Sequence, residues 1–169
     1  MAIEDEILTQ ALNFARMGFA VLPVHRPVPL DGLRVCSCGT VNCSSPAKHP
    51  VGRLVPTGVS QAMKEKREIT EWFAGTRHNI GLATGEISEL VALDIDPRHG
   101  GDTTLRLFER LHGKLPPTVR FTTGGGGEHV LFRHPGGYLP NSAGKIGPGV
   151  DVRSDGGYIV APPSEHMSG

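Results

Sequence analysis

Two aspartates separated by one residue, Asp94 and Asp96, end an apolar run that begins at Leu90. Side chains alternate along a strand, so both carboxylates point to one face and Ile95 points to the other. Two carboxylates at this spacing repel each other, and a divalent cation relieves the repulsion and turns the pair into a metal site. The alternative is a strand that ends in a polar turn, because Asp and Pro favour turns.

A third carboxylate, Asp151, lies in the middle of the segment Gly149–Arg153. Alternation turns Val150 and Val152 toward the core and leaves Asp151 and Arg153 on the opposite face. Beside the first two aspartates, Asp151 would complete a two-cation site of the kind that supports phosphoryl transfer. The planar guanidinium of Arg153 is suited to a phosphate. The alternative is a surface Asp–Arg pair, which contributes little to stability.

Four consecutive glycines, Gly124–Gly127, precede His129. Glycines such as Gly126 and Gly127 let backbone N–H groups approach a triphosphate, and a histidine at the start of a strand can donate to a phosphate oxygen. The alternative is a flexible loop followed by an ordinary polar histidine. Three further residues are candidates for phosphate contact, with a solvated surface role as the alternative for each: Lys48, Arg98 and His99.

A cluster of soft ligands has the pattern Cys-x-Cys-x4-Cys-x5-His, formed by Cys36, Cys38, Cys43 and His49. Three thiolates and one imidazole make a tetrahedral structural zinc site, and the segment has too few apolar residues to fold without a metal. His25 is a weaker substitute for His49 as the fourth ligand. A disulfide is the alternative, but three cysteines leave one unpaired. The acidic, amphipathic N-terminus is not a signal peptide, which favours a reducing compartment.

Composition describes a globular chain whose 169 residues suit one domain or one compact domain with two lobes. The formal net charge is zero, so the chain lacks the overall basic character of many nucleic-acid binders. Any such binding must come from local patches or from bound metal. No apolar stretch reaches the length of a membrane span, so we expect a cytoplasmic protein without a membrane partner.

The spacing of apolar residues predicts a mixture of helices and strands, which favours an α+β fold. Helices are expected over residues 3–17, from about 68, and over 103–112, with Asp102 as the N-cap of the last. Residues 26–58 are expected to be irregular. Strands are expected at 19–24, 80–85, 90–97, 119–122, 128–133, 149–153 and 158–161, with 154–157 joining the last two as a hairpin turn.

These residues resemble a known family, the bifunctional primase–polymerase domain of plasmid and phage replication proteins, in the archaeo-eukaryotic primase superfamily. The N-terminal helix and the strand after it fit the family as well, so the resemblance covers nearly the whole chain. Four segments in the same order carry the likeness: Cys36 to Pro50, Leu93 to Gly101, Thr123 to Phe132, and Gly149 to Ser164.

The resemblance implies a role for each motif. Asp94, Asp96 and Asp151 would be the catalytic residues that hold Mg²⁺ or Mn²⁺, and His129 would bind the phosphates of the incoming nucleotide. The zinc ligands would be the residues of the cysteine cluster. The implied fold is a two-lobed α+β primase–polymerase core around a sheet like that of an RNA-recognition motif, with a small zinc-binding stem. Residues 1–169 would form the catalytic core, and 34–50 the zinc-binding insertion.

The implied activity is template-directed nucleotidyl transfer by a DNA primase/polymerase, with a single-stranded DNA template, a primer and dNTP or NTP as partners. Because relatives usually continue beyond the last motif, we expect an N-terminal fragment of a longer replication protein with a helicase region, working in a bacterial or phage-infected cell. Two alternatives remain open. One is a zinc-stabilised, non-catalytic DNA-binding module. The other is an Asp-x-Asp phosphohydrolase, for which the chain lacks a convincing downstream Lys and acidic pair.

Overall fold

The computed structural model describes residues 3–169, which form two compact units. Unit 1 comprises the described residues up to Ala83 together with Val160–Gly169, and unit 2 comprises Thr84–Ile159. Helices combine with antiparallel sheets, so the predicted α+β class is confirmed. Within the described residues, no helix has both the length and the apolar character that crossing a membrane requires.

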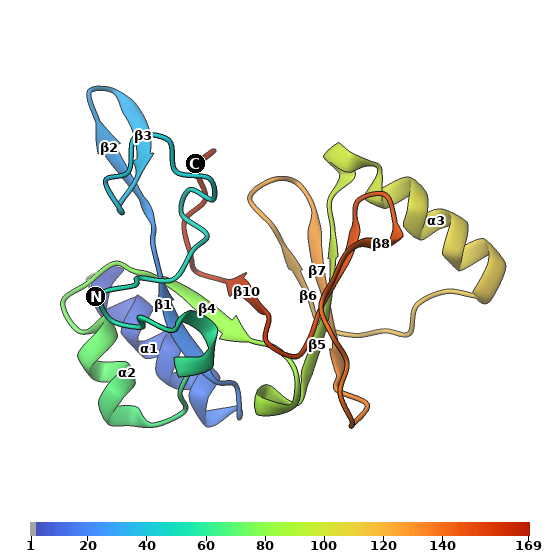
Figure 1. Ribbon diagram of the computed structural model, residues 1–169, viewed down its shortest axis with the longest axis horizontal. Coiled ribbons are helices and arrows are strands. Elements are labelled where there is room, and N and C mark those ends of the chain that lie inside the picture. The colour runs from blue at the N-terminus through green and yellow to red at the C-terminus, as the bar shows by residue number, and fades with distance from the viewer. Residues whose placement is uncertain (1–2) are drawn as a thin grey trace. The chain divides into compact units, whose positions relative to one another are not determined.

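Unit 1 is built on the antiparallel strands β1 (Val21–Val24) and β4 (Asn79–Ala83), and β10 (Tyr158–Ala161) extends them into a three-stranded sheet. Helices α1 (Ile3–Arg16) and α2 (Lys66–Phe73) contact each other and these strands (Figure 1). Each helix turns an apolar stripe inward, as its sequence periodicity predicts. The largest fully buried side chains of this unit include Leu22, Ile69, Phe73, Ile80 and Leu82.

Strands β2 (Pro27–Leu30) and β3 (Leu33–Cys36) form a hairpin, so the prediction that residues 26–58 are irregular is wrong for this part. The two residues between the strands, Asp31 and Gly32, both have positive φ, 48° and 78°. Asp-Gly is a preferred pair for a two-residue hairpin turn of this kind. The prolines in β2 obscure the strand pattern in the sequence, because proline cannot donate a ladder hydrogen bond.

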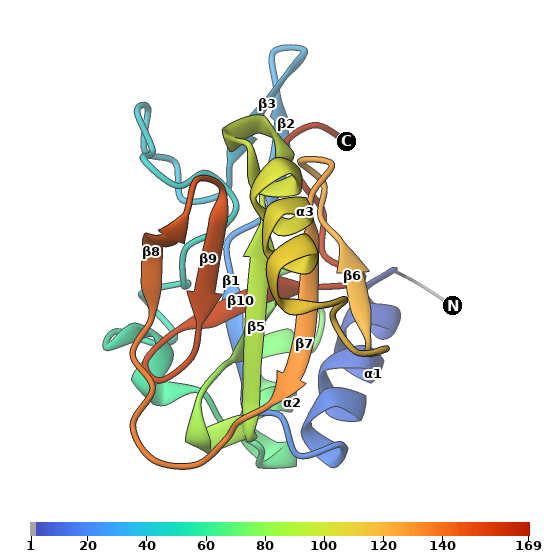
Figure 2. The same ribbon diagram turned by 90° about the vertical axis from the view of Figure 1, so that its right-hand side faces the viewer.

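Unit 2 is an antiparallel five-stranded sheet in the order β6-β7-β5-β9-β8, crossed by α3 (Gly101–His112), which contacts β5 and β9 (Figure 2). The strand bounds are β5 (Leu90–Ile95), β6 (Arg120–Thr122), β7 (Glu128–Arg133), β8 (Ser142–Gly147) and β9 (Val150–Arg153). The 3₁₀ helices of the described chain are η1 (Gly58–Gln61), η2 (Glu86–Ser88) and η3 (Pro97–His99). The central strand, β5, carries the aspartate motif.

The predicted hairpin between residues 149–153 and 158–161 is wrong, because β9 and β10 belong to different sheets. The polar groups of the connecting segment bond to other parts of unit 2. Thr84 donates its hydroxyl to the carbonyl of Ser154 at 2.7 Å and its N–H to the carbonyl of Gly157 at 2.9 Å. Asn141 Oδ1 accepts from the N–H of Ser154 at 2.7 Å. The N–H of Ser154 and the carbonyl of Gly157 are therefore already hydrogen-bonded and do not pair with each other as they would in a hairpin turn.

Helix α3 begins at Gly101, two residues earlier than an N-cap at Asp102 would allow. Its N-cap is Gly100, which has a φ of 85°, and Asp102 lies in the first turn, where it pairs with Arg106 at 2.8 Å. The correction has a steric cause, because only glycine adopts this left-handed conformation at no cost.

Candidate functional site

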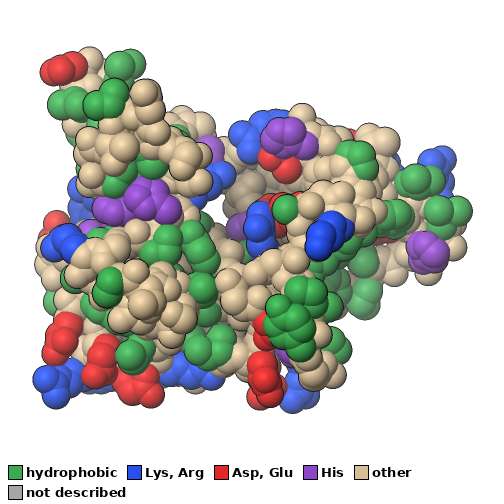
Figure 3. Space-filling view, in the orientation of Figure 1, with side chains coloured by type: hydrophobic (Ala, Val, Ile, Leu, Met, Phe, Trp, Pro, Cys, Tyr) green, Lys and Arg blue, Asp and Glu red, His purple; other side chains and the backbone are tan. Residues whose placement is uncertain are grey.

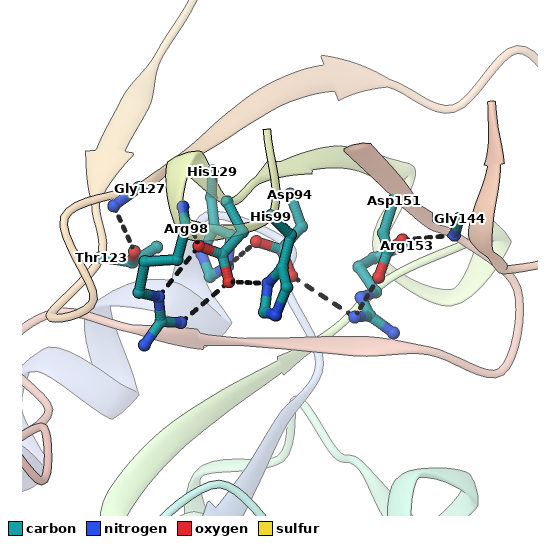
Figure 4. Close-up of polar contacts among 10 residues, drawn as sticks. Asp94, Arg98, His99, Thr123, Gly127, His129, Gly144, Asp151 and Arg153 are labelled. Carbon is teal, nitrogen blue, oxygen red and sulfur yellow. Dashed lines mark hydrogen bonds and ion pairs between the residues drawn. The ribbon is translucent and has the colours of Figure 1, made fainter. Parts of the chain in front are cut away.

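Asp94 lies near the end of β5, the central strand of the unit 2 sheet. The strand register pairs it with Asp151 of β9 on one side and with His129 of β7 on the other. Residues directly opposite each other in antiparallel strands point to the same face of the sheet. The three side chains therefore lie side by side on one face (Figure 4).

Short polar contacts connect these side chains through Arg153. One Arg153 nitrogen, Nη2, lies 2.9 Å from Asp151 Oδ2 and 3.4 Å from Asp94 Oδ2. His129 Nε2 lies 3.6 Å from the other Asp94 oxygen, and the N–H of Gly144 donates to Asp151 Oδ1 at 2.7 Å. The guanidinium thus offsets the repulsion between two adjacent carboxylates. The cluster combines hard oxygen donors with a phosphate-binding cation, and its aspartates are part-exposed.

Asp96 has a different environment, because the side chains of Arg98 and His99 in η3 lie against its carboxylate. Arg98 donates to Oδ1 from its backbone N–H and from Nε, both at 3.0 Å, and to Oδ2 from Nη2 at 2.8 Å. His99 Nδ1 lies 3.0 Å from Oδ2. The pKa of Asp96 therefore lies well below its ordinary range, chiefly because of the hydrogen bonds from the Arg98 side chain. Asp96 stays ionised, with both oxygens already bonded.

Within residues 3–169, the three aspartates do not bring their ligand atoms together as the cysteine cluster does. Asp94 and Asp151 are brought together by the register, whereas Asp96 is held by its own loop. A shared metal therefore requires Asp96 to exchange contacts with Arg98 and His99 for the metal. The contact of these two residues with Asp96 was not predicted from the sequence. Their position two and three residues after an aspartate at a strand end is the signal that indicates it.

We predict that Arg98→Ala raises the pKa of Asp96 toward the ordinary aspartate value of 3.8. The variant removes the side-chain hydrogen bonds and the positive charge that favour the ionised carboxylate. Titration of the Asp96 carboxyl carbon by NMR measures the midpoint. Arg106→Ala is the matched control, because Arg106 pairs with Asp102 and should leave the Asp96 midpoint unchanged. An unchanged midpoint in Arg98→Ala would contradict the assignment.

Two glycines, Gly101 and Gly149, fix the Asp96 backbone to the start of β9. The N–H of Asp96 donates to the carbonyl of Gly149 at 2.8 Å, and the N–H of Gly101 donates to the carbonyl of Asp96 at 2.9 Å. A Cβ on Gly101 would lie only 2.2 Å from the Gly149 oxygen. The close approach explains why glycine is needed at the start of α3 and just before the Asp151 strand.

We predict that Gly101→Ala lowers the free energy of unfolding by about 1–3 kcal/mol, the usual cost of overpacking a tight contact. Urea unfolding measures this loss. Gly52→Ala is the matched control, because a Cβ there meets no atom within 4 Å and Gly52 has no positive φ. Equal stability of the two variants would show that the backbone contact at Gly101 is not required.

The glycine loop closes on itself. The N–H groups of Gly126 and Gly127 donate to the carbonyl and the hydroxyl of Thr123 at 2.9 and 3.1 Å. A Cβ on Gly127 would lie 2.2 Å from the carbonyl oxygen of Ile95, so this glycine lets the loop pack against the end of β5. Both N–H groups thus have partners within the loop, and their contact with a triphosphate stays a prediction.

The cysteine cluster lies in unit 1, where Cys36, Cys38, Cys43 and His49 bring one ligand atom each to within 4.8 Å of one another. All three cysteines are free thiols, so the disulfide alternative is not supported. Sγ of Cys36 lies 3.5 Å from Nε2 of His49. This donor set fits a tetrahedral zinc ion with Zn–S bonds of about 2.3 Å.

Backbone N–H groups support two of the thiols. Ala47 donates to Sγ of Cys36 at 3.3 Å, and Thr40 donates to Sγ of Cys38 at 3.4 Å. Burial raises the pKa of the Cys36 thiol, whereas the Thr40 N–H lowers the pKa of the Cys38 thiol to about 6. A thiol with a low pKa reaches the thiolate form that binds zinc.

His25 is not part of this cluster. Its ring lies 4.5 Å from the His49 ring, and its Nδ1 lies 2.8 Å from the hydroxyl of Ser37. Of the two histidines considered from the sequence, the geometry therefore favours His49 as the ligand. Lys48 also belongs to unit 1, and its predicted contact with phosphate stays a prediction.

Comparison with protein families identifies one match, which covers residues 11–169 and is described as bifunctional DNA primase/polymerase, N-terminal. Comparison with curated proteins finds no match. Membership of this family points to a primase/polymerase of the nucleotidyltransferase type, with DNA and nucleotides as substrates. The match spans nearly all of the chain, including the aspartate, histidine and cysteine motifs, and the chain belongs to the Prim-Pol family.

Proposed function

We propose that this chain catalyses template-directed nucleotidyl transfer, extending a primer on single-stranded DNA from nucleoside triphosphates during plasmid or phage replication. The observation that carries the proposal is the register around Asp94, which has Asp151 on one neighbouring strand and His129 on the other. Two carboxylates and an imidazole on one face provide donors for cations and for a triphosphate.

The carboxylates fit Mg²⁺ or Mn²⁺, which prefer oxygen ligands. Asp94 and Asp151 would hold the ions, together with Asp96 once its oxygens leave Arg98 and His99. When bound, such ions lower the pKa of the primer 3′-hydroxyl and neutralise charge on the triphosphate. The released Arg98 and His99 side chains would then be available to phosphate oxygens.

The phosphate-binding role falls to His129 and Arg153. His129 lies 3.6 Å from Asp94, so it can hold a phosphate next to the carboxylates. Arg153 contacts both aspartates and can exchange them for phosphate oxygens, which would replace the carboxylates as its anionic partners. Gly126, Gly127 and Lys48 would add contacts to the triphosphate.

The remaining parts of the proposal concern architecture. The five-stranded antiparallel sheet would correspond to the sheet of a two-lobed primase–polymerase core that resembles an RNA-recognition motif. Residues 34–50 would be the zinc-binding stem within a core that spans 1–169. Zinc would be structural, because four protein ligands leave no open position. We further propose a cytoplasmic location and a helicase region elsewhere in the full-length protein.

Primer extension tests the proposal directly. A 5′-labelled primer annealed to a short template is incubated with the protein, Mg²⁺ or Mn²⁺, and either dNTPs or NTPs. The expected result is a ladder of products that depends on the template and on the metal. A protein that binds DNA but neither binds nucleotides nor extends the primer would instead match the non-catalytic DNA-binding alternative. A covalent phospho-aspartate would match the phosphohydrolase alternative.

A further inference from the structure

Unit 1 contains a cavity of about 350 Å³ whose ten lining residues include three arginines and two histidines. It lies within one unit, so its geometry does not depend on how the two units are placed. Histidine side chains gather with Lys and Arg side chains below the β2–β3 hairpin in Figure 3. The charged and titratable lining residues are His25, Arg26, Arg53, Arg77, His78 and Glu4.

Positive charge outweighs negative charge in this lining, because three arginines face a single lining carboxylate, Glu4. Arg77 is partly neutralised by Glu165, whose Oε1 it contacts at 2.9 Å. Within the described part of the chain, neither Arg26 nor Arg53 pairs with a carboxylate. Two of the arginines therefore keep their charge for a ligand.

His78 lines the cavity and is partly buried. The pKa of His78 is lowered to about 4, first by burial and then by the nearby charges of Arg53, His25 and Arg26. Its Nε2 atom is buried and has no hydrogen-bond partner among the described residues. Buried polar atoms in proteins are nearly always paired, so this one indicates a missing partner.

Ser37 links two residues of the cavity wall, His25 and Arg26. The hydroxyl of Ser37 lies 2.8 Å from His25 Nδ1 and accepts from the N–H of Arg26 at 3.1 Å. The N–H of Ser37 in turn donates to the carbonyl of Arg26 at 2.9 Å. These bonds fix the His25 ring and the backbone of Arg26 before any ligand binds, and such preorganisation lowers the cost of binding.

We propose that this cavity binds a phosphate group of a single-stranded DNA chain, through Arg26, Arg53 and the Nε2–H of His78. Guanidinium groups and a neutral imidazole N–H are donors that match phosphate oxygens. None of the residues that line the cavity is among those proposed to bind the triphosphate, and Asp94, His129 and Arg153 belong to unit 2. The phosphate site stands on its own geometry, and only the choice of DNA as its source rests on the proposed function.

The first test uses inorganic phosphate as the probe and NMR of the His78 ring as the readout. The ring signals are assigned by comparison with His78→Gln. Phosphate is expected to shift them while leaving the ring signals of His112, an exposed residue of α3, unchanged.

Arg53→Gln, a change at an exposed position, should reduce the shift of the His78 signals at a given phosphate concentration, and Arg26→Gln serves as the second variant. Absence of a His78 shift at millimolar phosphate would overturn the proposal. Because this readout involves no nucleotidyl transfer, it does not depend on the primer-extension result.

The second test measures the affinity for a labelled single-stranded oligonucleotide by fluorescence anisotropy over a salt series. Arg53→Gln is expected to weaken binding about three- to tenfold and to reduce the salt slope by about 0.7, as for one lost phosphate contact on a single strand. Arg16→Gln is the matched control, because Arg16 lies in unit 1, outside the cavity lining, and contacts Asn13. Equal affinities for the two variants would overturn the assignment to DNA. The assignment to DNA would also be overturned if free dNTP shifts the His78 signals to saturation and the oligonucleotide does not displace the dNTP.

Discussion

Replacement of Asp94 by asparagine is expected to lower the rate of primer extension about 10³-fold, with the fold unchanged. Asparagine keeps the size of aspartate but removes the charge that would hold a divalent cation, and such electrostatic losses at active sites have this magnitude. The backbone pairing with Asp151 and His129 does not depend on the side chain, so β5 should keep its register. Single-turnover extension with Mg²⁺ or Mn²⁺ measures the rate, and thermal unfolding checks the fold.

Asp151→Asn is expected to give a similar loss, because Asp151 is the direct cross-strand neighbour of Asp94. Asp102→Asn is the matched control, because Asp102 makes an exposed ion pair on α3 and should extend primers normally. Removing one of two adjacent carboxylates also relieves repulsion, so neither active-site variant should be much less stable than the parent. Extension at the parental rate by both variants would exclude these carboxylates from catalysis.

The sequence predicts part of the arrangement of Asp94 and Asp151, the two aspartates that the sheet brings together. Alternation along each strand predicts which face Asp94 and Asp151 take, because a side-chain period of two allows only two faces. The strand order that makes them neighbours is a tertiary property, which local sequence does not encode and only the family resemblance implies. Alternation is least useful for Asp96, which lies just after β5, where contacts with Arg98 and His99 of η3 determine the direction of the carboxylate.

Other elements were missed because their signals are not periodic. Strand β8 (Ser142–Gly147) has few apolar residues, and its pairing with β9 is irregular. The β2–β3 hairpin depends on the Asp31-Gly32 turn rather than on alternation. Strand β10 joins β4 in another sheet because contacts from Thr84 and Asn141 direct the chain there, and local sequence does not encode contacts of that range.

Replacement of His49 is also expected to have a large effect, in this case on the metal content and the stability of unit 1. His49→Gln should reduce bound zinc from one ion per chain to a small fraction of that value, because three thiolates remain without the fourth ligand. Metal binding supplies folding free energy to segments that lack an apolar core, so stability should fall by several kcal/mol. Metal analysis of the purified protein and urea unfolding measure the two effects.

His25→Gln is the matched control for this test, because it makes the same substitution at a histidine whose ring lies 4.5 Å from the ring of His49. Of these two histidines, His49 is the one that the described residues group with the cysteines, with Nε2 3.5 Å from Sγ of Cys36, so His25→Gln should retain its zinc. The segment is also attached to the core through Ala47, whose carbonyl accepts from the buried side chain of Asn79 at 3.2 Å. Loss of zinc should therefore increase hydrogen exchange first within residues 34–50 and leave the β1–β4 pair protected. Retention of zinc by His49→Gln, or its loss from His25→Gln, would reverse the ligand assignment.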